Sequence, residues 1–426
     1  MTNRTISPDI KDATDFSIRL PELERFTLDN GIPVYLMRAA NQETIQLDVV
    51  FNAGSWYENE DLLAAATNYL LKNGSRRHSA LEINETIEYY GAFVNRHCST
   101  EFADLTLHCM ASHAPKLLPV IREIITEASF PEEELSLYQQ NMKQRLLVNL
   151  QKCDFVANRH IDTYLFGAYH PYGRTSSLLA YDALQRESLQ GFHQKHYLFS
   201  QSRIFIAGNV SDEFLRQLNE QLGDRWSDGE PAQKKDFALQ PSTEKKFRID
   251  NDPNGVQGAI RIARLFPNRY HPDFPRMAVL NTIFGGYFGS RLMSNIREEK
   301  GYTYGIYSSL YNQRQSGAIN IATEAGKEVC EATIQEIYKE MKKLCAQPVP
   351  EEELSLVRNY IIGSLLGDLD GPFQVIQRWK NLILGDLDEH YFYNNVQTIK
   401  SISAEELQQL AQQYYQPEDF YELVVV

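Results

Sequence analysis

The chain has few cysteines and no long apolar run. Its 426 residues include five cysteines, an odd number, and no two of them form a CxxC pair. They are expected to be scattered, reduced thiols of an intracellular protein. No apolar stretch approaches the roughly 18 to 20 residues that a membrane helix needs, so no membrane span is expected. The first ten residues show neither the apolar core of a secretory signal nor an arginine-rich presequence. The expected location is cytoplasmic.

Positive charge is also scarce. The 42 Lys and Arg residues are outnumbered by 56 Asp and Glu residues, which leaves a net charge of −14 at pH 7. Sequence-independent nucleic-acid binding needs a basic footprint that displaces counterions from phosphates, and no Lys/Arg-rich block supplies one. Nucleic acid is therefore not expected as a partner. The acidic balance favours ordinary solubility over the alternative, electrostatic steering of basic peptides.

Several catalytic motifs are missing as well. The sequence contains neither HExxH nor HxxEH, no GxSxG and no phosphate-binding P-loop. Its ten histidines are scattered. His193 and His196 have helical i, i+3 spacing, which is more typical of an exposed polar face than of a metal site. No metal or other cofactor is therefore expected in this chain.

The most informative feature that is present is an internal repeat. The heptapeptide PEEELSL occurs at residues 131–137 and again at 350–356. At nearly the same offset, residues 189–208 and 407–426 each combine an apolar-periodic helix, a polar break and a strand rich in β-branched or aromatic residues. The length and the hydrophobic content of 43% allow two or three domains. We therefore interpret the chain as a duplication.

The two copies are expected at residues 20–225 and 243–426, joined by a polar, proline-containing linker at residues 227–246. In the first copy a hairpin, a further strand, two short helices, two strands, a helix at residues 115–128 and a long helix from Glu132 follow one another. Strands and helices gathered in runs predict an α+β fold. We expect two homologous domains, each an antiparallel sheet packed with helices.

Four segments resemble a known peptidase family. Residues 28–36 read LDNGIPVYL, residues 52–58 read NAGSWYE, and a predicted helix then leads to NGS at residues 73–75. Residues 284–309 read FGGYFGSRLMSNIREEKGYTYGIYSS. These segments resemble the pitrilysin/insulinase family of zinc metallopeptidases, which includes the mitochondrial processing peptidases and bacterial paired proteases. The resemblance covers nearly the whole chain and implies a clamshell form.

The same resemblance implies that the metal site of active members has degenerated here. With Asn73-Gly74-Ser75 as anchor, the HxxEH motif falls on residues 65–69, so Ala65 and Tyr69 replace the histidines and Asn68 replaces the catalytic glutamate. The third ligand falls on Gln144, or on its neighbour Arg145. None of these residues supplies His/His/Glu coordination, and an amide cannot act as the base for a zinc-bound water.

In paired members of the family, the subunit without zinc supplies an arginine and a tyrosine from its second half. By resemblance these fall on Arg297 and Tyr304, with Tyr302 as the rival tyrosine. When Gly91 and Gly301 are matched as helix ends, the two residues lie opposite the apolar Ile87 and Val94 of the first half. A guanidinium can hold a peptide carbonyl, and a phenol can donate to a developing oxyanion.

The function that the resemblance implies is that of a non-metal-binding subunit in a heterodimeric zinc peptidase. A homologous partner with an intact HxxEH is expected to carry the zinc, and an extended peptide is the expected substrate. This chain alone is expected to be inactive. The alternative is a catalytically inert structural or peptide-binding homologue that acts as a homodimer.

Overall fold

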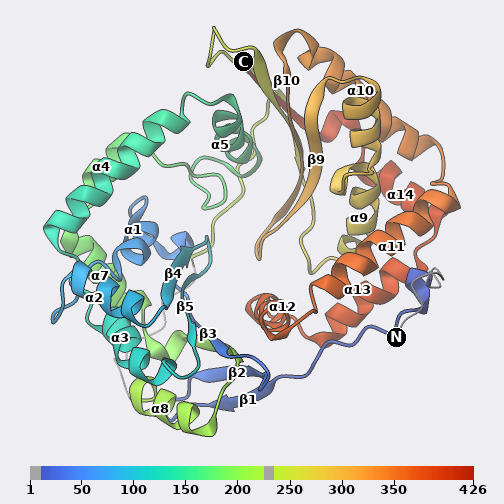
Figure 1. Cartoon of the computed structure of the whole chain (residues 1–426). Coiled ribbons are helices and arrows are strands. Elements are labelled where there is room, and N and C mark those ends of the chain that lie inside the picture. Colours follow the sequence, from blue (N-terminus) through green and yellow to red (C-terminus); the bar gives the residue numbers. More distant parts are fainter. Residues whose placement is uncertain (1–10, 225–234) are drawn as a thin grey trace.

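The computed structural model describes residues 11–224 and 235–426 and contains two sheets, each packed with helices (Figure 1). The first sheet consists of β1 (Glu24–Thr27), β2 (Pro33–Arg38), β3 (Thr44–Phe51), β4 (Phe93–Cys98), β5 (Ala103–Met110) and β6 (Arg203–Gly208). The second consists of β7 (Lys246–Ile249), β8 (Gln257–Leu265), β9 (Thr303–Asn312), β10 (Gly317–Gly326) and β11 (Tyr421–Val425).

The helices are divided between the two halves. The first half contains α1 (Leu63–Leu70), α2 (Ala80–Tyr89), α3 (Ala114–Thr126), α4 (Glu132–Asn149), α5 (Cys153–Phe166), α6 (Leu178–Ala183), α7 (Arg186–His196) and α8 (Asp212–Leu222). The second contains α9 (Asp273–Asn281), the π-helical η4 (Thr282–Gly286) and η5 (Met293–Glu299), α10 (Cys330–Ala346), α11 (Glu351–Gly367), α12 (Pro372–Leu384), α13 (Glu389–Ser401) and α14 (Ala404–Tyr414). No helix within the described ranges is both long and apolar enough to span a membrane.

The strand orders of the two sheets repeat one another. The first sheet runs β1-β2-β6-β3-β5-β4 and the second β7-β11-β8-β10-β9, so the second reproduces the first without β1. This repetition confirms the predicted α+β fold with two similar halves. The sheets are mainly antiparallel, as expected, except that β2 and β6 pair in parallel, as do β7 and β11. Since β6 and β11 each insert between two strands of opposite direction, each must run parallel to one neighbour.

The repeated heptapeptide starts the equivalent long helices α4 and α11. The residues before them, Pro131 and Pro350, have nearly the same backbone angles, with φ and ψ of −58° and 140° for the first and −57° and 141° for the second. Three glutamates follow in the first turn of each helix. Proline has no backbone N–H to donate, so it is tolerated at the start of a helix and not within it. Carboxylates in the first turn interact favourably with the positive end of the helix dipole. The same sequence therefore begins the same helix twice.

The two halves exchange the helices that follow. Helix α5 of the first half packs on β8 and β11 of the second sheet, and α12 of the second half packs on β2 and β6 of the first (Figure 1). Each contact is apolar: Ile161 and Leu165 lie against Ala263 and Leu423, and Ile376 lies with Phe205 and the neighbouring strand residues. Burial of such surfaces stabilises the contact between the halves.

The predicted linker at 227–246 lies partly outside the described residues, since residues 225–234 are not described. Its described part, 235–246, contains no helix or strand before Lys246, which begins β7. Trp56 holds it to the first half, because the indole Nε1 donates to Lys235 O at 2.9 Å and the ring lies edge-on to Phe237. The chain therefore returns along the first half before it enters the second sheet.

Candidate functional site

Helix α1, which carries the predicted remnants of the metal motif, is anchored at its N-terminus by Glu58. The Glu58 carboxylate accepts a hydrogen bond from Ala64 N at 2.9 Å and pairs with Arg174 Nη2 at 2.6 Å. Burial raises the pKa of Glu58 to about 7, although the hydrogen bond from Ala64 and the charge of Arg174 oppose the shift. A buried acceptor thus satisfies a backbone donor that the helix start would leave unpaired.

The predicted metal positions on α1 offer no metal ligand. Ala65 ends in a methyl group. Asn68 is 2% exposed, and its Nδ2 donates to Asp104 O at 3.2 Å. The Tyr69 ring packs against the Tyr138 ring of α4, with centroids 4.9 Å apart. A carboxamide that donates to the backbone and a phenol packed against a neighbouring ring do not replace histidine and glutamate, so these residues do not fit a zinc ion.

An arginine lies beside these positions. The guanidinium of Arg96, on β4, stands over the Tyr69 ring at 4.9 Å, and its Nη1 donates to Tyr69 O and, at 3.1 Å, to Asn73 Oδ1. Burial lowers the pKa of Arg96. Arginine nonetheless stays charged in proteins. A fixed positive charge at this point repels a metal cation, so the local electrostatics agree with the missing ligands.

The two positions predicted for the third ligand are both exposed on α4. Tyr138 marks the side of α4 that faces α1, because it contacts Tyr69. Arg145 follows Tyr138 by about two turns and lies on nearly the same side, whereas Gln144 is about 100° further around the helix. Neither side chain is a carboxylate, so neither predicted position supplies the third ligand of a zinc site.

No group of three or more His, Cys, Asp or Glu side chains that could hold a metal occurs in the described residues. The expectation that His193 and His196 lie on an exposed face was wrong, because both are buried. His193 Nε2 lies 2.7 Å from Ile125 O, and burial lowers the pKa of each histidine to about 4. Both histidines are part of the core of the first half, where His193 packs against Phe130 and Tyr197, and His196 packs against Phe192.

These buried histidines contribute stability that is lost in acid. Their folded pKa of about 4 lies below the ordinary value of 6.5, so the unfolded chain binds more protons between these limits. The contribution of these histidines to the free energy of unfolding should therefore be greatest above pH 6.5 and should fall as the pH drops towards 4, by roughly 3 kcal/mol for His193. Glu58 and Asp162, whose pKa values are raised to about 7, contribute with the opposite sign, so the histidine contribution is measured as the difference between the wild type and a histidine variant. Urea unfolding between pH 4.5 and 7.5 measures this. His193→Gln should flatten the dependence, whereas His390→Gln, at an exposed histidine, should not; equal pH slopes in the wild type and His193→Gln would contradict the assignment.

The predicted arginine and tyrosine lie at the junction of η5 and β9. Arg297, near the end of η5, places its guanidinium 4.5 Å from the centroid of the exposed Phe288 ring. It makes no other charged or hydrogen-bonded contact within the described residues. Tyr304, on β9, is 91% exposed, whereas its rival Tyr302 packs partly buried against the core of the second half. Both Arg297 and Tyr304 thus have donors available to another molecule.

A β-bulge explains why Tyr304 points outward although its counterpart Val94 is buried. Gly91 and Gly301 have similar left-handed φ angles of 60° and 67°, so the two strands begin alike. The β4–β5 ladder is continuous, but the β9–β10 register shifts between Thr323 and Ala325, which leaves Tyr304 and Gly305 opposite one residue. A bulge re-aims side chains at such a point.

Tyr304 also borders a cavity that the sequence did not reveal. Its volume is about 350 Å³, and its walls include Arg261 of β8 and the acidic Asp154 and Glu324. Arg261 is buried, and its Nε donates to Asn158 Oδ1 of α5 at 2.7 Å. The one signal in the sequence is a charged residue inside the apolar run AIRIA at residues 259–263. The cavity places both charge signs beside the exposed phenol.

Comparison with known proteins assigns the family. Residues 34–169 match the profile described as "Insulinase (Peptidase family M16)", and residues 183–361 match the one described as "Peptidase M16 inactive domain". A Bacillus subtilis protein named "Uncharacterized zinc protease YmxG" is 23% identical over 402 residues, which are 92% of this chain and 96% of that protein.

Solved structures show the same fold. A protease from Helicobacter pylori superposes with a TM-score of 0.87 at 16% identity, over 96% of this chain and 100% of that one. A "peptidase M16 inactive domain" from Pseudomonas fluorescens gives a TM-score of 0.83 at 21% identity, over 95% of this chain and 98% of that one. Together with the two profile matches, these similarities show that the chain belongs to the insulinase (M16) peptidase family, with the two-domain clamshell fold of that family.

Proposed function

We propose that this chain is the non-metal-binding subunit of a heterodimeric zinc peptidase and contributes Arg297 and Tyr304 to catalysis across the subunit interface. One contrast carries the proposal. The positions that would ligate zinc hold Ala65, Asn68 and Tyr69, whereas Tyr304 is 91% exposed at a bulge. A large exposed aromatic residue with a free hydroxyl suits contact with another molecule better than it suits the stability of this chain.

The two residues would act on the scissile peptide in different ways. The guanidinium of Arg297 would donate to a substrate carbonyl. It lies 4.5 Å from the centroid of the Phe288 ring, and this contact restricts the conformations of the Arg297 side chain before the substrate binds. The phenol of Tyr304 would donate to the oxygen that becomes negative when water attacks the carbonyl carbon. The second effect belongs to the transition state, because the negative charge is absent from the bound substrate.

A homologous partner with an intact HxxEH motif would supply the zinc ion and the general base. The cytoplasm is the proposed location, and an extended peptide enclosed between the subunits is the proposed substrate. The exposed edge strand β9, which carries Tyr304, lies at the end of the second sheet, where it can reach a partner. This chain would bind no metal ion itself, since the residues at its predicted metal positions do not fit one.

Peptidase activity is expected only when the two subunits are mixed. This chain with added zinc should not cleave a quenched-fluorescence peptide library, whereas a mixture with the HxxEH-bearing homologue should. The rate of fluorescence increase measures cleavage, and a chelator should abolish it in the mixture. Chelator-sensitive cleavage by the rigorously purified chain alone would contradict the proposal, as would a stable complex without any activity.

The alternative is an inert homologue that forms a homodimer and holds peptides or serves a structural role. A cavity between β3 and α12, whose two ionic residues Asp368 and Arg378 pair with each other, favours peptide holding within this alternative. The molar mass of the isolated chain, measured by light scattering, distinguishes a homodimer from a monomer that pairs with a different subunit.

A further inference from the structure

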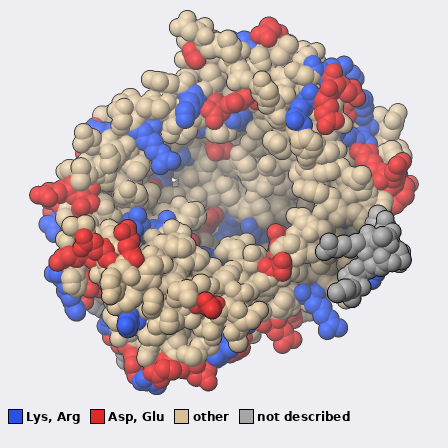
Figure 2. Space-filling view, in the orientation of Figure 1, with Lys and Arg blue, Asp and Glu red and all other residues tan. Residues whose placement is uncertain are grey.

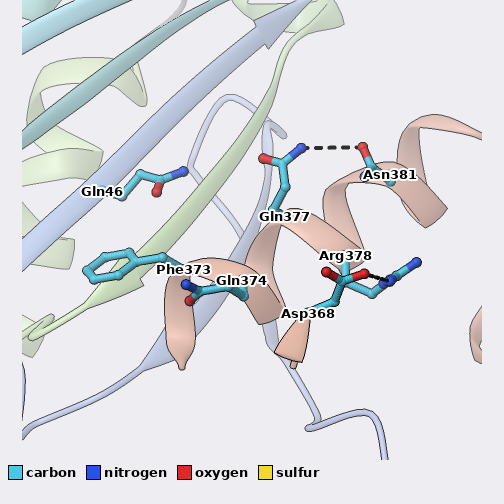
Figure 3. A pocket seen from close by; sticks show the side chains of 7 residues that line it. All are labelled: Gln46, Asp368, Phe373, Gln374, Gln377, Arg378 and Asn381. Atoms are coloured by element: carbon cyan, nitrogen blue, oxygen red, sulfur yellow. Dashed lines mark hydrogen bonds and ion pairs between the residues drawn. The ribbon is translucent and has the colours of Figure 1, made fainter. Parts of the chain in front are cut away.

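A second cavity lies far from Arg297 in the sequence, between β3 of the first sheet and α12 of the second half (Figure 3). Its volume is about 470 Å³, within the range of roughly 300–1,000 Å³ typical of ligand pockets. Four of its lining residues share one chemical group, the carboxamide: Gln46, Gln374, Gln377 and Asn381. In Figure 3 the side chain of Gln46 projects from its strand toward those of α12.

The exchange of helices between the halves creates this cavity. On α12, Gln374, Gln377 and Asn381 follow one another at i, i+3 and i+7, on an exposed side of the helix beside its contact with the first sheet. Gln46 lies directly opposite His108 of β5, which in turn lies opposite Phe93 of the edge strand β4. These three strand residues share one sheet face. The three carboxamide side chains of α12 therefore lie beside the face of the first sheet that carries Gln46.

The cavity carries no unbalanced charge. Its two ionic residues, Asp368 and Arg378, pair with each other, with Arg378 Nη2 2.6 Å from Asp368 Oδ2. The space-filling view shows a separate, larger hollow between the halves, with side chains of both charge signs at its lower border (Figure 2). A ligand in the cavity would be selected by hydrogen bonding rather than by its charge.

The carboxamides keep hydrogen-bonding capacity for a ligand. Gln46 Nε2 donates to Asp48 Oδ2 at 3.0 Å, which leaves its carbonyl oxygen free among the described residues. Gln377 Nε2 donates to Asn381 Oδ1 at 3.3 Å, which leaves the Gln377 oxygen and the Asn381 amino group. Gln374 has no side-chain partner in the described part of the chain. Acceptors and donors are therefore both present.

We propose that this cavity binds the backbone of an extended peptide segment through its side-chain carboxamides. A carboxamide has one carbonyl acceptor and an N–H₂ donor, the same two functions as a peptide unit, so it can pair with the backbone whatever the side chains are. The proposal rests on the proposed function for the identity of the ligand as a peptide. It adds a holding site on this chain that is independent of sequence and separate from Arg297 and Tyr304.

Other ligand classes fit the lining less well. A phosphate would need a free cation, and Arg378 is already paired. A sugar ring would need an exposed aromatic face, but Phe373, the one aromatic residue of the lining, packs against Val50 and Phe205. A peptide needs neither, because its repeated N–H and C=O groups match the carboxamides.

The test measures binding rather than cleavage. The probe is a fluorescein-labelled, unstructured 12-residue peptide of mixed composition, together with a copy of it that is N-methylated at alternate backbone positions. Fluorescence anisotropy with the full chain alone should show weaker binding of the N-methylated peptide, because it lacks half of its N–H donors. Gln46→Leu and Gln377→Leu should each raise the Kd of the unmodified peptide by about threefold to tenfold, the usual range for one lost hydrogen bond.

Gln335→Leu is the matched control. Gln335 is an exposed glutamine within α10 and donates to the side chain one turn away, Glu331 Oε1, at 3.2 Å, much as Gln377 does to Asn381. It should leave the Kd unchanged. Three results would each overturn the proposal: equal affinity for the unmodified and the N-methylated peptide, an unchanged Kd for both Gln46→Leu and Gln377→Leu, or no peptide binding by the chain. If the mixed subunits fail to cleave but these effects persist, the proposed catalytic role fails and the holding site stands.

Discussion

Tyr304→Phe is expected to lower kcat of the mixed peptidase by about a hundredfold to a thousandfold, the usual cost of removing one donor to an oxyanion. The substitution keeps the ring and removes the hydroxyl alone. Because Tyr304 is 91% exposed and makes no hydrogen bond within the described residues, the stability of the chain should not change. KM should change little, since the oxyanion exists in the transition state and not in the bound substrate. Steady-state kinetics on a single quenched peptide measures both constants.

The tyrosines near Tyr304 provide the controls. Tyr307→Phe, at a half-exposed tyrosine on the same strand, should leave kcat unchanged. A loss with Tyr302→Phe instead of Tyr304→Phe would transfer the role to Tyr302. Arg297→Lys should also reduce activity, because an ammonium group cannot reproduce the planar pair of donors of a guanidinium. If neither Tyr304→Phe nor Arg297→Lys affects cleavage, the proposed catalytic contribution of this chain is wrong.

Lys380→Met is expected to destabilise the folded chain by about 3–5 kcal/mol, the usual result of removing one partner from a buried ion pair. Lys380, on α12, is 7% exposed, and its Nζ lies 3.3 Å from Asp48 Oδ2 and 3.5 Å from Asp104 Oδ2. Asp48 is 1% exposed, and its Oδ1 has no other partner among the described residues. The substitution would leave that carboxylate buried without its counter-charge. Urea unfolding at pH 7 measures the loss.

Two further variants separate charge from packing. Adding Asp48→Asn to Lys380→Met should recover part of the lost stability, because it removes the uncompensated charge. Lys339→Met, which removes an exposed lysine 3.0 Å from Glu336 Oε2, should change the unfolding midpoint little. Equal, small effects of Lys380→Met and Lys339→Met would show that the contact between α12 and the first sheet does not depend on this buried lysine.

Much of the fold follows from local patterns along the chain. The repeated PEEELSL predicted equivalent helices because a proline followed by three glutamates favours a helix start wherever it occurs. The spacing of turns and apolar residues located β1 to β5 in order. Sequence patterns did not predict the parallel pairs, because the place where β6 and β11 enter their sheets depends on how strands far apart in the chain pack.

The same division applies to the candidate sites. Residue identity alone argues against His/His/Glu coordination of zinc, because alanine, asparagine and tyrosine at the predicted positions 65, 68 and 69 include none of these ligands in any fold. The outward direction of Tyr304 depends on the bulge opposite Glu324, and the stacking of Arg96 on Tyr69 depends on the contact between α1 and β4. The carboxamide cavity exists because α12 crosses to the other half's sheet. These arrangements arise from packing between elements, which at the cavity brings together residues hundreds of positions apart and which no local sequence pattern records.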